Sequence, residues 1–98
     1  MTTVTVDYLE NTIEIKGHTL DPVVCHALSG LIDSVSMWLE KKVNARVIMD
    51  DDAYCKIMPP DKCNHKDFLY YVEFLQFLTD SIIQIDDNNP CNIEIKVK

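Results

Sequence analysis

Two long segments with the apolar periodicity of a helix lie within a chain of only 98 residues, and they limit what this chain can fold into. The first begins at Pro22 and runs to about Lys42, and the second runs to about Ile85 from a cap at Asn64 or Asp67. Apolar residues recur at steps of three and four in both, so each predicted helix has an apolar stripe that needs a surface to cover. The stripes are Val24, Leu28, Leu31, Ile32, Val35, Trp38 and Leu39 in the first helix, and Phe68, Leu69, Val72, Phe74, Leu75, Leu78, Ile82 and Ile83 in the second.

Short segments with alternating apolar and polar residues supply that surface. They are Thr2–Tyr8, Thr12–Lys16, Ala45–Met49, Ala53–Met58 and Cys91–Lys98. Turns are expected at Glu10-Asn11, at Asp50–Asp52 and at Asp86–Pro90. The order β-β-α-β-β-α-β predicts a single α+β domain over residues 1–98, with two helices packed on one face of a mainly antiparallel sheet. We expect the other face of the sheet to be polar or used for association.

Composition and charge argue against several classes of protein. There is no uninterrupted run of 18 apolar residues and no signal peptide at the N-terminus, so we expect a cytoplasmic protein with no membrane span. The net charge of −7 disfavours nucleic acid as a partner and would suit a basic peptide, although negative charge also simply aids solubility. In that compartment the cysteines are expected to be reduced, and none of them forms a CxxC pair. They are Cys25, Cys55, Cys63 and Cys91.

The segment IKGHTLDPVVCHALS, residues 15–29, carries the strongest chemical signal. His18 follows the second predicted strand, and Cys25 lies in the first turn of the first predicted helix. A strand end and a helix start joined by a short connection lie close together, so we expect the imidazole and the thiol to face each other. The free amides and the dipole of a helix start stabilise a thiolate, and a neighbouring histidine can act as a base. Cysteine is also a common buried residue, so the spacing alone leaves a structural role open.

Three neighbouring residues are candidates for supporting roles. Gly17 permits a positive φ or a close approach of the backbone to a substrate, or it simply ends the strand. Asp21 is a good N-cap ahead of Pro22, and it is also close enough in sequence to orient His18. Ser29, one helical turn after Cys25, is placed to bond near the thiol or to a carbonyl of its own helix.

The motif GHT, a short gap and DPVVCHALSG resembles the signature of the ribosomal-processing cysteine protease family, Prp. Gly17 and His18 match the Gly-His of that pattern, Val23-Val24-Cys25 matches its apolar pair and nucleophile, and Ser29 matches its serine. The resemblance implies a Cys25–His18 dyad that cleaves an N-terminal extension of a ribosomal large-subunit protein, or a phage structural protein, with no cofactor. It extends to the order of strands and helices along the whole chain.

This sequence departs from the family pattern at several positions. Thr19 replaces the usual alanine, His26 replaces the small residue after the nucleophile, and the acidic residue Asp21 lies one position further from Cys25. The connection from His18 to Cys25 is also shorter than the glycine-containing, mobile loop that the family has. These departures support an alternative, in which the fold is kept as a catalytically inactive dimeric interaction module.

Two further expectations concern association and metal binding. Tyr70, Tyr71 and Phe77 fall outside the second apolar stripe and leave little of that helix polar, which predicts burial on two sides or a homodimer. The family resemblance also favours a homodimer. A zinc site formed by Cys55, Cys63 and His65, with or without Cys91, is a weaker idea, because structural zinc ligands usually come in tight pairs. We therefore expect no metal.

Overall fold

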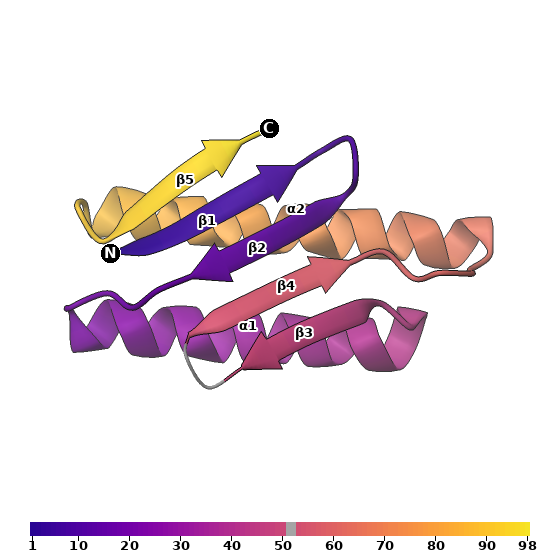
Figure 1. Cartoon of the computed structure of the whole chain (residues 1–98), viewed down its shortest axis with the longest axis horizontal. Helices are drawn as coiled ribbons and strands as arrows, with labels where there is room; N and C mark the ends of the chain where they lie inside the picture. Colours follow the sequence, from indigo (N-terminus) through magenta and orange to yellow (C-terminus); the bar gives the residue numbers. More distant parts are fainter. Residues whose placement is uncertain (51–52) are drawn as a thin grey trace.

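The computed structural model describes residues 1–50 and 53–98 and has the predicted order of elements, β1-β2-α1-β3-β4-α2-β5. The elements are β1 Thr2–Asp7, β2 Thr12–Lys16, α1 Pro22–Val43, β3 Arg46–Asp50, β4 Tyr54–Met58, α2 His65–Asn88 and β5 Ile93–Val97. The strands form one sheet in the order β3-β4-β2-β1-β5, antiparallel except for the β1–β5 pair (Figure 1). The expectation of an α+β fold with a mainly antiparallel sheet is confirmed.

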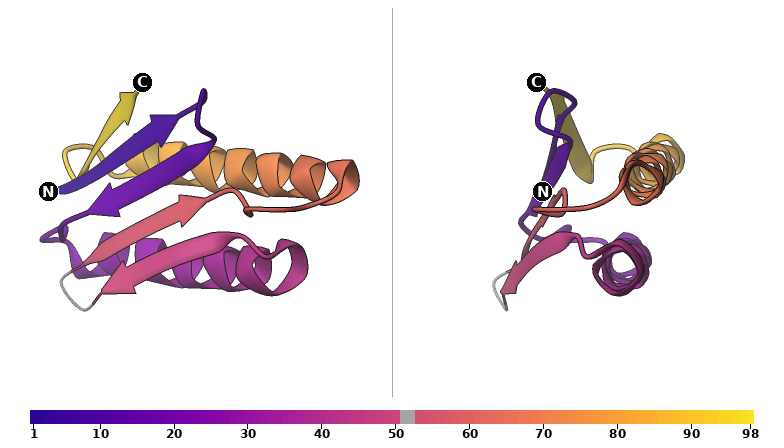
Figure 2. Two further views of the ribbon diagram at one scale, coloured as in Figure 1. Left: turned by 45° about the vertical axis from the view of Figure 1, so that its right-hand side comes forward. Right: turned by 90° about the vertical axis from the view of Figure 1, so that its right-hand side faces the viewer.

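Both helices cover the same face of the sheet, and its other face is open, as the end-on view shows (Figure 2). The buried face alternates along each strand as a period of two requires, for example Val4 and Val6 in β1 and Ile13 and Ile15 in β2. On the open face the Tyr54 hydroxyl donates to Glu14 across the β2–β4 pair at 2.7 Å. The open face is therefore polar, which was one of the two predicted alternatives.

The helix starts follow from their caps. Asp21 is the N-cap of α1 with Pro22 as its first residue, and the Asn64 side chain accepts a hydrogen bond from the backbone N–H of Asp67 at 2.8 Å. Asn64, rather than Asp67, is thus the cap of α2. At the other end of α1, Asn44 takes a left-handed conformation with φ 59°, which ends the helix.

Several predicted boundaries are wrong by a few residues, for local reasons. β1 ends at Asp7 because the Asp7 carboxylate accepts the backbone N–H groups of Leu9 and Glu10 and forms a turn. Ala53 and Cys91 have positive φ values of 57° and 74°, so β4 and β5 begin after them. β3 begins one residue later than predicted and runs to Asp50, at Arg46–Asp50.

The end of α2 and the turns need corrections as well. α2 continues through Asn88, so three residues of the turn predicted at Asp86–Pro90 are helical, and Asn89 caps the helix. Of the turn predicted at Asp50–Asp52, Asp50 belongs to β3, while Asp51 and Asp52 lie outside the described residues.

The core lies between the sheet and the two helices. On α1 five residues of the predicted stripe are buried and Leu31 and Trp38 are partly buried at its margin, while Val43, outside the predicted stripe, is buried as well. On α2 the prediction misplaced Tyr71, which is fully buried and donates its hydroxyl to the Asn11 carbonyl at 2.6 Å. Leu69 and Ile83, which were assigned to the stripe, are instead exposed. The sheet, and not the helix pattern alone, thus decides which side of α2 faces inward.

By length and composition α1 would also qualify as a membrane-crossing helix. Helices of protein cores pass the same test, and the apolar stripe of α1 is buried in the core of this fold. The stripe is therefore accounted for by packing on the sheet.

Candidate active site

His18 is positioned by Gly17 at the end of β2. Gly17 has φ +90°, and a Cβ at this position would lie only 2.7 Å from the carbonyl oxygen of Met1. Its N–H donates to the Ala53 carbonyl at 2.9 Å, and its own carbonyl accepts from the Thr2 hydroxyl at 3.3 Å. Of the roles left open for Gly17 by the sequence, the positive φ is the one that the structure shows. The close approach is to the protein's own N-terminal backbone.

Cys25 is positioned by the start of α1. The Asp21 carboxylate accepts the N–H of Val23 at 2.9 Å and that of Val24 at 3.5 Å, and the Asp21 carbonyl accepts the N–H of Cys25 at 2.9 Å. The first turn is therefore well anchored, and Cys25 lies in it with its side chain partly exposed.

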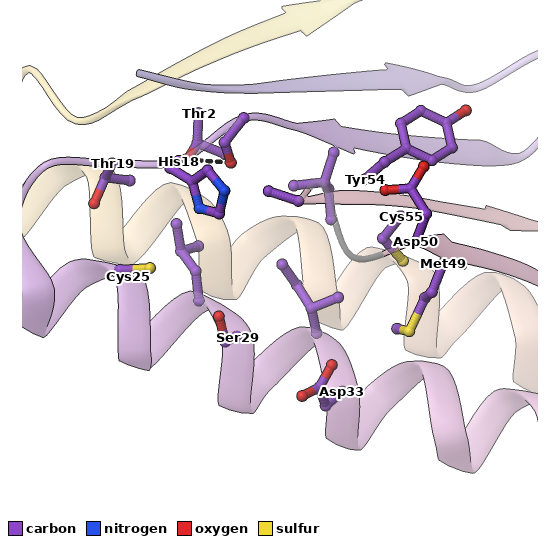
Figure 3. Close-up of a pocket in the computed structure, with 15 residues that line it drawn as sticks. Thr2, His18, Thr19, Cys25, Ser29, Asp33, Met49, Asp50, Tyr54 and Cys55 are labelled. Atoms are coloured by element: carbon purple, nitrogen blue, oxygen red, sulfur yellow. Dashed lines mark hydrogen bonds between the residues drawn. The ribbon is translucent and has the colours of Figure 1, made fainter.

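The two side chains line one cavity of about 270 Å³ between α1 and the ends of β2, β3 and β4. Figure 3 shows the His18 imidazole on the strand side of this space and the Cys25 thiol on its helix side. Gly17 and Ser29 line it as well, so four of the five residues selected from the sequence border the same cavity. The fifth, Asp21, is not among its lining residues.

Two expectations about the start of α1 change with these contacts. The Asp21 carboxylate is used as a helix cap, and the interactions of the described residues include none between Asp21 and His18. The amides expected to be free at the start of α1 are also engaged, because those of Val23, Val24 and Cys25 already have acceptors in Asp21. A helix cap satisfies the same amides that an oxyanion would need.

The hydroxyl groups around the cavity differ in whether they are already engaged. Thr2 donates to the Gly17 carbonyl and Thr19 donates to the Asp21 carbonyl, while Tyr54 directs its hydroxyl to the open face of the sheet and donates to the Glu14 carboxylate there. This last bond lowers the pKa of Glu14 and raises that of Tyr54, so Tyr54 stays a neutral donor. Within the described part of the chain, the Ser29 hydroxyl is the one lining the cavity that has no hydrogen-bond partner.

The far end of the cavity contains residues that the sequence analysis did not select. Asp33 lies on α1 two turns beyond Cys25, and Met49, Asp50 and Cys55 come from β3 and β4. Burial, with a smaller contribution from the Asp33 charge, raises the pKa of the Cys55 thiol to about 11, so Cys55 remains a thiol at neutral pH. The four-residue spacing of positions 25, 29 and 33 on one helix could have identified Asp33, whereas no local sequence signal places the strand residues at this cavity.

The residues of the zinc hypothesis do not come together. Cys55 is buried in β4, whereas Cys63, His65 and Cys91 are exposed. Across residues 1–50 and 53–98 there is no group of three or more His, Cys, Asp or Glu side chains able to hold a metal ion. The structure therefore gives the zinc hypothesis no support.

No protein-family model matches the chain, and no curated protein is detectably similar to it in sequence. Solved structures, however, share its fold over its whole length. The ribosomal processing protease Prp from S. aureus, in complex with a covalently linked product peptide, is 23% identical with a TM-score of 0.78, and all of both chains is covered. The same protease with a substrate peptide aligns at 17% identity with a TM-score of 0.78.

A third solved structure, SMU.848 from Streptococcus mutans, is 20% identical with a TM-score of 0.72, covering 98% of this chain and 90% of that one. Similarity at this level of identity is similarity of fold. The two-helix, five-strand fold described above is thus similar to that of the Prp ribosomal processing protease, and this chain has a divergent Prp-like fold.

Proposed function

We propose that this protein is a cysteine endopeptidase of the Prp type, with Cys25 as nucleophile and His18 as general base and acid. The observation that carries the proposal is the convergence of the two side chains on one cavity, from the end of β2 and the first turn of α1. The fold of the Prp protease, which has been seen bound to peptides, supports it.

In the proposed mechanism, His18 takes the thiol proton of Cys25, and the thiolate sulfur attacks the carbonyl carbon of a peptide bond. The tetrahedral intermediate collapses when the C–N bond breaks and the His18 imidazolium gives its proton to the leaving amine. A thioester to Cys25 remains. Water, deprotonated by His18, attacks this thioester and releases the carboxylic acid and the thiol. The overall reaction consumes one water molecule and requires no cofactor.

Ser29 is proposed as a donor to the substrate or to the oxyanion. It lies one helical turn beyond Cys25, lines the cavity and has no hydrogen-bond partner among the described residues. Because Asp21 already engages the first amides of α1, a side-chain hydroxyl is the donor at hand on this wall of the cavity.

The proposed substrate is an extended basic peptide. Apolar side chains of Leu28, Ile32 and Met49 line the cavity together with the carboxylates of Asp33 and Asp50. No lysine or arginine is among the described residues that line it, so the cavity favours a cationic segment. The N-terminal extension of a ribosomal large-subunit protein in the cytoplasm fits this chemistry, as does a phage structural protein with a basic segment.

The dyad is tested with a proteome-derived peptide library, in which new N-termini are identified by mass spectrometry. We expect cleavage by the wild type and a loss of at least about a thousandfold in Cys25→Ala and His18→Ala, because a nucleophile or its base is removed. The matched controls are Cys63→Ala and His65→Ala, which change exposed residues of the same types outside the cavity. Cleavage that persists in Cys25→Ala would contradict the proposal.

A second candidate function is the inactive dimeric interaction module, and one observation favours its dimeric part. On the helix layer Phe77 is about half exposed and lies against Phe74, whose ring stacks on Trp38 at 4.1 Å. We propose that this cluster pairs with a second copy of the chain, with or without catalysis. Light scattering at micromolar concentration should then give a dimer that Phe77→Glu dissociates; a monomeric wild type argues against pairing.

A further inference from the structure

We infer that Thr19 is a positioning residue that holds His18 and Cys25 in a fixed relation, so that the site is formed before substrate binds. This inference rests on the proposed Cys25–His18 dyad. It concerns the connection between β2 and α1, residues 17–21, which is shorter than the mobile loop that the Prp family has.

Thr19 is the one inward-facing side chain of this connection. It is 8% exposed, whereas the following residue, Leu20, is 97% exposed and His18 is also exposed. The Thr19 hydroxyl donates to the Asp21 carbonyl at 3.0 Å. A buried hydroxyl needs such a partner, and this bond folds the connection onto the start of the helix.

The acceptor of the Thr19 hydrogen bond also contacts Cys25, and this links Thr19 to both residues of the dyad. The same Asp21 carbonyl also accepts the backbone N–H of Cys25 at 2.9 Å. One oxygen therefore joins the residue next to His18 to the backbone of Cys25. Figure 3 shows Thr19 beside His18 on the strand side of the cavity, with Cys25 below them on α1.

His18 is also held from its other side. Gly17 donates to the Ala53 carbonyl of the neighbouring strand and accepts from the Thr2 hydroxyl. His18 thus lies between two anchored neighbours, while its own side chain is left facing the cavity. A connection anchored at both ends has little freedom to act as a lid, and Thr19 is the anchor on the side of Cys25.

Thr19→Val separates the hydroxyl from the shape of the side chain, and Thr19→Ser restores the hydroxyl. The helix cap does not depend on Thr19, because Asp21 caps α1 through its carboxylate, so we expect both variants to fold. Folding is checked by thermal melting. If Thr19→Val does not fold, Thr19→Ala removes the hydroxyl with less risk of crowding and is measured in its place.

The readout is the rate of Cys25 alkylation by iodoacetamide from pH 5.5 to 9, resolved by mass spectrometry, with exposed Cys63 in the same sample as reference. We expect His18→Ala to change the pH profile of Cys25 and Thr19→Val to move the profile towards that of His18→Ala. The expected change in rate near pH 6.5 is about 5-fold, as for the loss of one hydrogen bond. Thr19→Ser should keep the wild-type profile.

Three results would overturn the inference, and they differ in what else they remove. A wild-type profile in a folded variant without the hydroxyl, together with a changed profile in His18→Ala, removes the role of Thr19 and leaves the dyad. An unchanged profile in His18→Ala removes the dyad, and the positioning role with it. A profile in Thr19→Ser that matches Thr19→Val would also contradict the inference, since the hydroxyl is then irrelevant.

Discussion

The two strand-to-helix connections of this fold contain the same kinds of residue but differ in what surrounds them. Residues 17–21 join β2 to α1, and residues 59–64 join β4 to α2. Each connection ends in a capping Asp or Asn, and each has a cysteine and a histidine at or near it. In the first connection the two side chains line one cavity, whereas Cys63 and His65 of the second are exposed and do not line that cavity.

The backbone explains this difference. The first connection turns sharply at Gly17, which has a positive φ, and Thr19 folds it back onto the helix start. The second starts with Pro59-Pro60, residue types that favour an extended chain, and the Pro59 carbonyl accepts from the exposed Arg46 side chain. A cysteine and a histidine near a helix start therefore occur in both connections of this fold. The cavity between helix and sheet is what distinguishes the candidate active site from the other pair.

The largest effect is expected from Gly17→Ala, which should break the first connection. The alanine would keep a left-handed backbone conformation that is strained for any residue with a Cβ, and this Cβ would clash with the Met1 carbonyl. We therefore expect the free energy of unfolding to fall by about 1–3 kcal/mol and Cys25 reactivity to fall with it. Urea denaturation measures the first, and alkylation the second. The control is Gly30→Ala in α1, with no neighbour within 4 Å of the new Cβ, which should gain about 0.5–1 kcal/mol. Equal effects of the two would contradict this account.

A smaller effect on catalysis is expected from Ser29→Ala, which tests whether the helix turn after Cys25 contacts the substrate. If Ser29 donates to the oxyanion, kcat on a peptide found in the library should fall about 10- to 100-fold with little change in KM. Ser34→Ala is the control, because Ser34 is exposed on the same helix and does not line the cavity. Unchanged kcat in Ser29→Ala would remove Ser29 from the mechanism.

Removing the helix cap of each connection compares their contributions to stability and to the reactivity of Cys25. Asp21→Ala and Asn64→Ala should each cost about 1 kcal/mol of unfolding free energy, because each leaves amides at a helix start without an acceptor. Only Asp21→Ala should also change the rate at which Cys25 is alkylated. If Asn64→Ala changes that rate equally, the effect comes from global stability and not from the first connection.

The smallest effect concerns Cys55, at the far end of the cavity. Its pKa is raised from 9.0 to about 11, so in folded protein at pH 8 we expect iodoacetamide to modify exposed Cys63 and Cys91 and to spare Cys55 until guanidinium unfolds the chain. Because the unfolded thiol releases its proton at lower pH than the folded one, stability should decline as pH rises from about 9 to 11. A Cys55→Ala variant should show less of this decline. Rapid modification of Cys55 at pH 8 would contradict its burial.

The sequence by itself determined the features that depend on neighbours along the chain. Periods of two and of three to four residues identified the seven elements, and the cap Asp21 followed from residue type and position, while the cap of α2 was narrowed to Asn64 or Asp67. The proximity of His18 and Cys25 followed because a short connection cannot separate its ends. Boundaries at Ala53 and Cys91 were missed, because a positive φ in a residue other than glycine has no clear sequence signal.

Only the tertiary structure decided which residues meet across the fold. It buried Tyr71 and exposed Leu69, and it brought Cys55 into the cavity of Cys25. Both outcomes depend on how the strands pair and on which face of α2 meets the sheet, and these contacts join residues far apart in the chain. Local patterns define the period of an element, but they do not define the partner against which that element packs.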